Sequence, residues 1–289
     1  MGRTAPIVAA LLLFASARAA LAYTAAGDRT FPATILLPQA APADEFYVTP
    51  EFQPIPGGQT TKLNVTLDKT LTERLGAQLS DGYTWLGRSG AATQGGWQNL
   101  QLVVKYLAIR DAQHEALVSL GISREWGGTG TSSIGVAASG ATAPTLYAAK
   151  GLGDLDLGYL RPLALTGVLG WQFADARPRA DALVSGLALE YSIPYLQSKV
   201  QALPLPDALR RMTALVEAFV VTPQRSSGGS RESATLGPGV SYAGDGWEFA
   251  VEALVPLSRG AGTGIGVAAQ LHVALDYFFE GPIGRPLFR

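Results

Sequence analysis

Two stretches near the C-terminal end of the chain decide the fold: WEFAVEALVPL at 247–257 and QLHVALDYFF at 270–279. In both, apolar or aromatic residues alternate with a second set that includes Glu248, Glu252, His272 and Asp276. Because successive side chains of a β-strand point to opposite faces, each stretch has one apolar face and one face with ionisable groups. A soluble sandwich would bury the apolar face, whereas a transmembrane barrel would turn it toward lipid.

The same alternation recurs along most of the chain. It predicts further strands at 45–53, 60–68, 75–86, 97–107, 115–126, 145–150, 163–173, 183–191, 213–222 and 232–243. This gives about twelve strands of about ten residues, the length that crosses a bilayer. Tight turns alternate with longer glycine-rich loops such as 87–96 and 127–144, which is typical of outer-membrane barrels. We therefore expect an all-β, antiparallel transmembrane β-barrel; a soluble all-β sandwich or lipid-binding barrel is the alternative.

One segment interrupts this rhythm. Residues 193–210 contain Pro194, Pro204 and Pro206, which prevent a single long strand. Asp207 precedes Ala-Leu-Arg-Arg and could cap a short helix. We expect 193–210 to be an insertion that is not part of the barrel wall. Either 127–144 or 193–210 could form a constriction of the lumen.

Composition narrows the function. The chain of 289 residues is only 16% charged, has a net charge of -1 and contains no Cys. Such a balance argues against a nucleic-acid partner, because phosphate binding needs a basic surface. Disulfides, cysteine metal sites and thiol catalysis are excluded.

Residues 1–22 have the pattern of a cleaved secretory signal peptide. Arg3 gives the positive start, 6–14 the apolar stretch and Ala20-Leu21-Ala22 the cleavage site. The apolar stretch is shorter than the ~20 residues of a spanning helix. The expected organisation is a signal peptide at 1–22, a periplasmic lead-in at 23–44, the barrel at 45–279 and a C-terminal tail at 280–289. It implies the bacterial outer membrane, with the bilayer and the outer-membrane assembly machinery as partners.

Several short motifs resemble those of a known family. They are 150–155 (KGLGDL), 160–163 (LRPL), 193–197 (IPYLQ), Glu217 followed by Thr222-Pro223, and 284–288 (GRPLF). The chain resembles the bacterial outer-membrane putative transporters grouped with the MetA-pathway phenol-degradation family. This resemblance implies an outer-membrane barrel that passes small or hydrophobic molecules. One departure is that ten residues follow Phe279, whereas outer-membrane barrels usually end on the aromatic end of the last strand.

The face opposite the apolar one would line the lumen. The lumen-lining candidates are Asp68, Lys105, Glu115, Glu125, Glu190, Glu217, Glu248, Glu252, His272 and Asp276. Acidic groups dominate this set, and a ring of carboxylates in a water-filled pore favours cations or polar solutes over anions. Alternatively, the carboxylates pair with Lys105, Arg124 or Arg161 and fill a narrow barrel, since small barrels are filled by side chains.

Catalysis has weaker support. A barrel hydrolase acting on lipid would need a nucleophile and a base. Of the two histidines, His114 is expected at a periplasmic turn, where lipid A is absent, and Ser241 could neighbour His272 without a distinctive motif to support the pair. His272 is expected on the lumen face, whereas a lipid-acting site should face lipid. No motif for a cofactor or a metal rises above chance. We therefore expect a channel or transporter for small molecules that is not an enzyme, with a lipid-modifying hydrolase and a structural barrel with a filled lumen as the alternatives.

Overall fold

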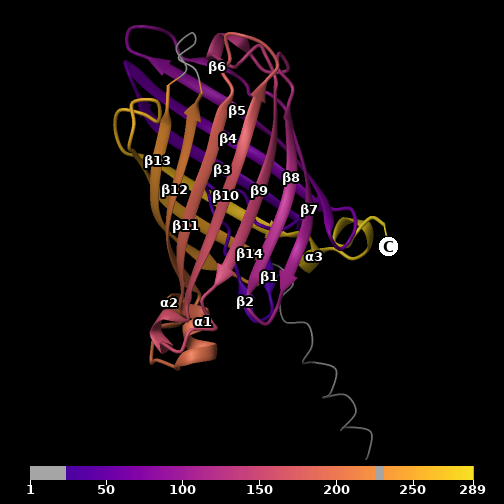
Figure 1. Ribbon diagram of the computed structural model, residues 1–289. Coiled ribbons are helices and arrows are strands. Elements are labelled where there is room, and N and C mark those ends of the chain that lie inside the picture. The colour runs from indigo at the N-terminus through magenta and orange to yellow at the C-terminus, as the bar shows by residue number, and fades with distance from the viewer. Residues whose placement is uncertain (1–23, 225–230, 289) are drawn as a thin grey trace, which may run out of the picture.

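A computed structural model describes residues 24–224 and 231–288 (Figure 1). The expected signal peptide at 1–22 lies outside the described residues. The wall consists of β3 (Glu45–Ile55), β4 (Gly58–Thr70), β5 (Leu75–Arg88), β6 (Gln94–Trp97), β7 (Gln101–Asp111), β8 (Ala116–Glu125), β9 (Ala141–Gly151), β10 (Leu163–Ala174), β11 (Ala182–Ser192), β12 (Met212–Pro223), β13 (Ser233–Ala243), β14 (Trp247–Pro256) and β15 (Gly266–Ala274).

These strands form a closed, antiparallel, twelve-stranded barrel. Neighbours in sequence pair with each other, and the barrel closes where β15 pairs with β3. The short β6 and the longer β7 both pair with β5, so together they take one place in the wall. The expected all-β antiparallel barrel of about twelve strands is confirmed.

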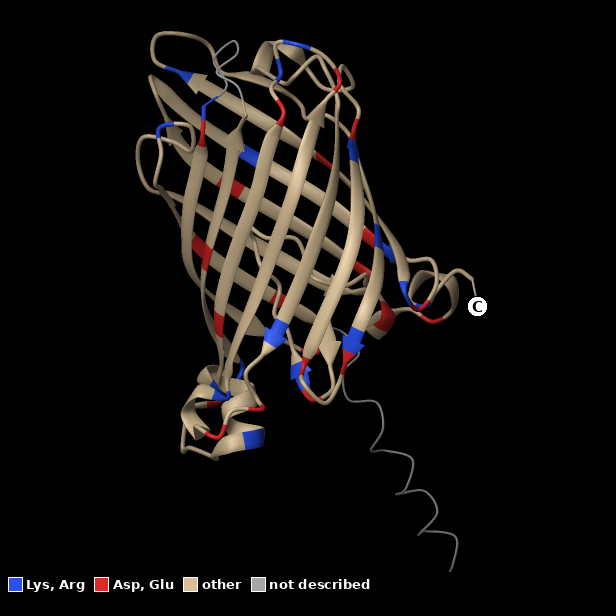
Figure 2. Cartoon of the chain, viewed as in Figure 1, with Lys and Arg blue, Asp and Glu red and all other residues tan. Residues whose placement is uncertain are grey.

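The outer face of the wall is apolar. Exposed apolar residues occur on successive strands: Leu67, Leu79, Tyr106, Leu120, Leu146, Leu169, Leu187, Val216, Val240, Phe249 and Leu271. Much of the wall carries neither Lys, Arg, Asp nor Glu (Figure 2). Charged residues in the middle of strands, such as Glu190, Glu217 and Glu252, are buried and do not belong to the outer face. A soluble sandwich buries such apolar residues, so this arrangement has the inverted polarity of a barrel in lipid. Among the described residues, no helix is both long and apolar enough to cross a membrane.

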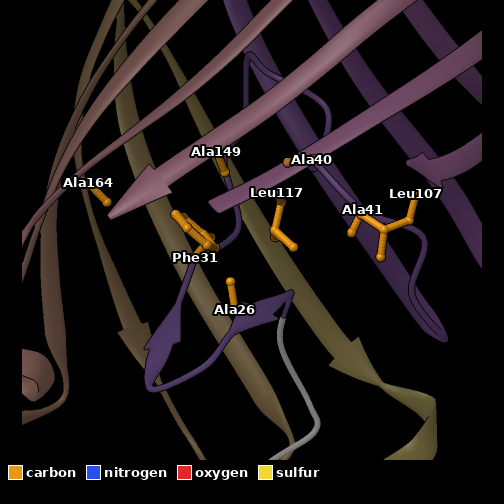
Figure 3. Close-up of a cluster of buried hydrophobic side chains, with 8 residues drawn as sticks. All are labelled: Ala26, Phe31, Ala40, Ala41, Leu107, Leu117, Ala149 and Ala164. Atoms are coloured by element: carbon orange, nitrogen blue, oxygen red, sulfur yellow. The ribbon is translucent and has the colours of Figure 1, made fainter. Parts of the chain in front are cut away.

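The N-terminal segment departs from expectation. Residues 24–44, expected as a periplasmic lead-in, run from the rim into the lumen and back, with Ala33, Ile35 and Gln39 in contact with buried residues of the wall. We call residues 24–44 the inner segment; it contains the short strands β1 (Ala25–Ala26) and β2 (Arg29–Thr30). Phe31 of this segment packs in a buried cluster with wall residues, among them Leu117 and Ala149 (Figure 3).

The inner segment enters and leaves at the same rim. β1 and β2 lie beside the turn 112–115, where a Cβ on Gly27 would meet the carbonyl oxygen of Ala112 at 2.3 Å. The segment returns to this rim at Asp44, whose carboxylate accepts hydrogen bonds from the Thr70 backbone and hydroxyl. Ala40 and Ala41 share the cluster of Phe31, so the two limbs lie side by side (Figure 3).

The insertion at 193–210 lies beyond the wall at this same rim (Figure 1). It forms α1 (Ile193–Tyr195), the π-helical turn η3 (Leu196–Val200) and α2 (Asp207–Arg210). A short helix is present as expected, but Asp207 does not cap it. Asp207 is its first residue, and the N-cap is Pro206, without a side-chain cap hydrogen bond. The loop before β9 contains the 3-10 turn η1 (Ser132–Ile134), and η2 (Gly158–Leu160) precedes β10.

The last strand is shorter than expected. β15 ends at Ala274, and 275–278, expected to continue the strand to Phe279, form α3 (Leu275–Phe278). Ala274 pairs with Glu45, the first residue of β3, while Val273 pairs with Trp247, the first residue of β14. Beyond Ala274 neither neighbouring strand continues, so the backbone makes its hydrogen bonds within a helical turn. The tail then includes η4 (Gly281–Ile283), and Phe288 N donates to Leu71 O at 2.8 Å.

Candidate functional site: the lumen and its inner segment

Most of the sequence-predicted lumen residues point inward and are buried. Fully or almost fully buried are Asp68, Lys105, Glu115, Glu190, Glu217, Glu248, Glu252 and His272, with exposed fractions of 0–6%. Burying unpaired charges this deeply would be costly. The inner segment resolves much of this cost because its backbone and side chains supply hydrogen-bond partners.

Glu217 on β12 makes the densest set of these contacts. Its Oε1 accepts from the backbone N–H of Ile35 at 2.8 Å, and its Oε2 accepts from those of Leu36 and Leu37 at 3.0 and 2.9 Å. Three successive N–H groups that converge on one anion form a nest, a common anion-binding arrangement of the backbone. The carboxylate of the wall thus fixes the turn of the inner segment.

Two further wall residues hold the same turn. Glu248 Oε2 accepts from Ala33 N at 3.1 Å, and Lys105 Nζ donates to Gln39 O at 2.6 Å. Gln39 Nε2 also lies 3.3 Å from His272 Nε2, which lies 2.9 Å from Glu45 Oε2. Glu248 therefore contacts the inner segment at Ala33, and Lys105 and His272 both contact it at Gln39.

Arg29 anchors the other end of the inner segment. Its Nε donates to Glu115 Oε2 at 3.1 Å, and its Nη1 donates to Pro162 O at 3.1 Å. Nη2 donates to Arg161 O. The guanidinium carbon lies 3.7 Å from the centre of the Tyr195 ring, whose hydroxyl donates to Glu115 Oε1 at 2.7 Å. Arg29 is only 1% exposed, so this site, which we call the Arg29 socket, is closed.

Three of the sequence motifs meet in the Arg29 socket. They are 150–155, 160–163 and 193–197, which are separate in the sequence. A Cβ on Gly151 would lie 2.6 Å from Arg29 Nε, and one on Gly153 would lie 2.2 Å from Tyr195 Oη. Both positions therefore need glycine for close approach. The motifs build the attachment point of the inner segment.

Beside the inner segment, the lumen contains a polar chamber of about 460 Å³. Its floor is the turn 34–39 of the inner segment. Its walls come from β3, β4, β5, β7, β8, β14 and β15, together with residues 98 and 99 between β6 and β7. Half of the residues that line it carry amides or hydroxyls: Thr34, Gln39, Tyr47, Thr49, Asn64, Thr66, Gln78, Ser80, Gln98, Asn99, Gln101 and Gln270. The apolar part of the lining lies mainly in the floor, at 35–38. The inner segment thus separates this chamber from the rim where it is anchored.

Two predicted lumen residues lie apart from the buried group. Glu125 lies at the chamber end, where its Oε2 accepts from Arg179 Nη2 at 2.6 Å and its Oε1 from Asn99 Nδ2 at 2.7 Å. Asp276 lies on α3, beyond the last strand, because β15 ends earlier than expected. Burial and the nearby carboxylates of Glu45 and Asp44 raise the pKa of Asp276 to about 6.

The alternative catalytic pair is not assembled. Ser241 is on β13 and His272 is on β15, with β14 between them. His272 is 2% exposed and lies inside the barrel, away from the apolar outer face. Among residues 24–224 and 231–288, no group of three or more His, Asp or Glu side chains could hold a metal ion.

Sequence reasoning missed the residues of the inner segment, above all Arg29 and the N–H groups of 35–37. One signal was available in the sequence: the inward-facing residues include more carboxylates than cations. Buried carboxylates need hydrogen-bond donors, so a part of the chain outside the wall strands had to supply them. Fold and lumen together define the class of this protein: a closed twelve-stranded antiparallel barrel whose own N-terminal segment occupies part of its interior.

No protein-family model and no curated protein matches the chain. Among solved structures, it is similar to the KdgM porin in complex with disordered oligogalacturonate, with 14% identity, a TM-score of 0.48, and coverage of 79% of this chain and 98% of that one. The translocator domain of the autotransporter NalP from Neisseria meningitidis has 13% identity and a TM-score of 0.39, covering 79% and 85%. CdiB from Acinetobacter baumannii has 9% identity and a TM-score of 0.35, covering 79% and 59%.

Proposed function

We propose that this protein is an outer-membrane barrel that lets small molecules through its lumen when the inner segment moves aside. The observation that carries this proposal is the division of the lumen into a chamber and a closed end by residues 24–44. The apolar outer face supports a place in the bilayer. Most of the longer loops, such as 126–140, 175–181 and 257–265, lie at the chamber end and support that end as the outer one, with 152–162 and 193–211 at the other rim as exceptions. Removal of residues 1–22 and insertion by the outer-membrane assembly machinery belong to the same proposal.

The contacts of the inner segment suit a gate better than a permanent core. It is held by hydrogen bonds at Ala33, the turn 35–37 and Gln39, and by a small apolar cluster around Phe31. Three ion pairs add to these contacts, namely Arg29–Glu115, Asp28–Lys199 and Asp44–Lys69. Because both limbs leave at the same rim, the segment can withdraw without breaking any wall strand. The resemblance to the phenol-degradation family suggests small hydrophobic or aromatic molecules as solutes, whereas the lining of the chamber is polar.

A reversible crosslink tests this proposal. A Cβ on Gly186 of β11 would lie 3.1 Å from Leu37 Cγ, so cysteines at both positions can form a disulfide between wall and segment. The native chain has no Cys, so no other disulfide can form. We expect liposomes that contain the oxidised Leu37→Cys/Gly186→Cys variant to show little solute flux, and reduction by dithiothreitol to restore it. Each single-cysteine variant, treated in the same way, is the control.

The outcomes separate the alternatives. Equal flux in the oxidised and reduced states would show that passage does not require the inner segment to move. Absence of flux in both states, from wild-type and variant protein shown to be folded and inserted, would favour a structural barrel with a filled lumen. That second candidate has one observation in its favour, the burial of the segment's contacts with Glu217 and Glu248.

A further inference from the structure

We infer that the chamber binds small carbohydrates without net charge, or solutes of the same neutral, polyhydroxylated kind. This inference rests on the proposed function, since it names the class of solute that would enter the lumen. It follows from three properties of the chamber, as the described residues form it: amides that have no partner, cations that are already paired, and the lack of an extended aromatic wall.

Among the described residues, three side-chain amides on adjacent strands are free to bind a solute in the chamber. Asn64 of β4, Gln78 of β5 and Gln101 of β7 line the chamber. Within the described part of the chain, their side-chain amides make no hydrogen bond. Each offers both donors and an acceptor. A hydroxyl group is likewise donor and acceptor, so a polyhydroxylated solute can satisfy several of these amides together.

The charged groups of the chamber disfavour an anion. Glu51 is paired with Lys62 at 2.9 Å, and Glu125 is paired with Arg179 at 2.6 Å. The carboxylate of Asp81 accepts from the Gly82 backbone at 2.7 Å and has no cationic partner in the described ranges. With both cations engaged and one carboxylate left over, an acidic solute would meet repulsion without a compensating ion pair.

The same lining disfavours a hydrophobic or aromatic solute. Such a molecule would cover Asn64, Gln78 and Gln101 without replacing their hydrogen bonds to water, which leaves buried polar groups unsatisfied. The aromatic ring that lines the chamber is Tyr47, and it is already in edge contact with His272, with ring centres 4.7 Å apart. The chemistry of the chamber therefore differs from what the family resemblance implies.

The test uses a matched pair of ligands. Glucose and glucuronate differ only in the carboxylate at carbon 6, and phenol represents the aromatic alternative. Binding is measured by calorimetry on the purified full-length protein in an amine-oxide detergent, because sugar-headed detergents would compete. We expect saturable binding of glucose, at least tenfold weaker binding of glucuronate, and no saturable binding of phenol.

Near-isosteric variants locate the site. We expect Asn64→Leu and Gln101→Leu each to weaken glucose binding at least fivefold. Gln113→Leu, at an exposed turn of the opposite rim, is the control and should leave binding unchanged. Folding of each variant is checked by resistance of the barrel to unfolding in SDS at room temperature.

The possible results distinguish this inference from the proposed function. Glucuronate that binds as tightly as glucose, phenol that binds better than either, or glucose binding that survives both substitutions would overturn the carbohydrate site. If glucose does not bind but flux through the crosslinked variant still depends on reduction, the carbohydrate site is overturned and the proposed movement of the inner segment is supported. If glucose binds but no flux occurs in the oxidised or the reduced state, the carbohydrate site is supported and the proposed channel function is overturned.

Discussion

Arg29 and Glu115 are joined by an ion pair of 3.1 Å between Nε and Oε2, across 86 positions of the chain. The pair connects the inner segment to the start of β8, and both side chains are nearly inaccessible, at 1% and 8% exposed. Carbonyl oxygens of Arg161 and Pro162 and the ring of Tyr195 complete the surroundings of the guanidinium. This buried ion pair therefore fixes one end of the inner segment to the barrel wall.

Removing the guanidinium of Arg29 should free the inner segment from the wall. Arg29→Ala leaves Glu115 buried and without its cation, a change that costs ~3–5 kcal/mol in buried pairs. We expect residues 24–44 to become accessible to added protease and the conductance of the reconstituted protein to rise. Lys199→Ala is the matched control, because Lys199 pairs with Asp28 at the surface, where such pairs contribute ~0–1 kcal/mol. Unchanged protease resistance in Arg29→Ala would show that the socket does not hold the segment.

Glu217 should govern the mobility of the turn. In Glu217→Gln one carboxylate oxygen becomes an NH₂ group, which cannot accept from the N–H groups of 35–37. Each lost hydrogen bond to a charged group costs ~1.5–3 kcal/mol. We expect hydrogen exchange at the amides of Ile35, Leu36 and Leu37 to accelerate at least tenfold.

Glu190→Gln is the control for that experiment. Glu190 is as buried as Glu217, at 1% exposed, but its Oε1 accepts from Thr166 Oγ1 on the neighbouring strand at 2.8 Å. It should leave the exchange of the turn unchanged. If both variants accelerate exchange equally, general loosening of the barrel rather than loss of the nest is responsible.

The tryptophans should report lipid contact. All five of them, Trp85, Trp97, Trp126, Trp171 and Trp247, are 36–57% exposed. Because tryptophan concentrates at the membrane interface in such barrels, we expect brominated lipids to quench most of the fluorescence of the reconstituted protein. Bromine near the headgroups should quench more strongly than bromine near the bilayer centre. Fluorescence that brominated lipid leaves unchanged would argue against a bilayer around this barrel.

The attachment of α3 should depend on pH through Asp276. The pKa of this carboxyl is raised from 3.8 to about 6, so the folded state binds a proton more tightly than the unfolded state. The stabilisation is therefore full below pH ~4, falls as the pH rises to ~6 and stays low above it. Relative to wild type, we expect Asp276→Asn to gain about 1 kcal/mol between pH 4 and pH 7, after allowance for solvent screening of a half-buried group.

Urea unfolding at a series of pH values measures this difference. The variant cannot ionise at position 276, so the contrast with wild type isolates this one group. A constant difference between the two proteins across pH 4–7 would contradict the prediction.

Alternation along the chain was sufficient to predict the wall. The apolar face of each strand repeats every second residue, so strands such as 247–256 and the inward direction of Glu248 and Glu252 follow from local sequence. The inner segment could not be predicted in this way. Its conformation is set by Glu217, Lys105 and Glu115, which are distant in sequence, and its own Ala, Pro and Thr residues have no period. The end of β15 was also missed, because the position where β3 and β14 begin determines it.

The seam between β15 and β3 has a consequence for how the protein folds. It joins Val273 to Phe46, so the closing hydrogen bonds form between opposite ends of the chain. Contacts between residues so far apart in sequence form slowly, because the conformational entropy of the long intervening chain is lost before the contacts stabilise the fold. Glu217 and Glu248, which hold the interior, lie on strands that precede the seam. The last step of folding must therefore enclose residues 24–44, and substitutions that weaken their contacts should slow barrel closure as well as loosen the finished protein.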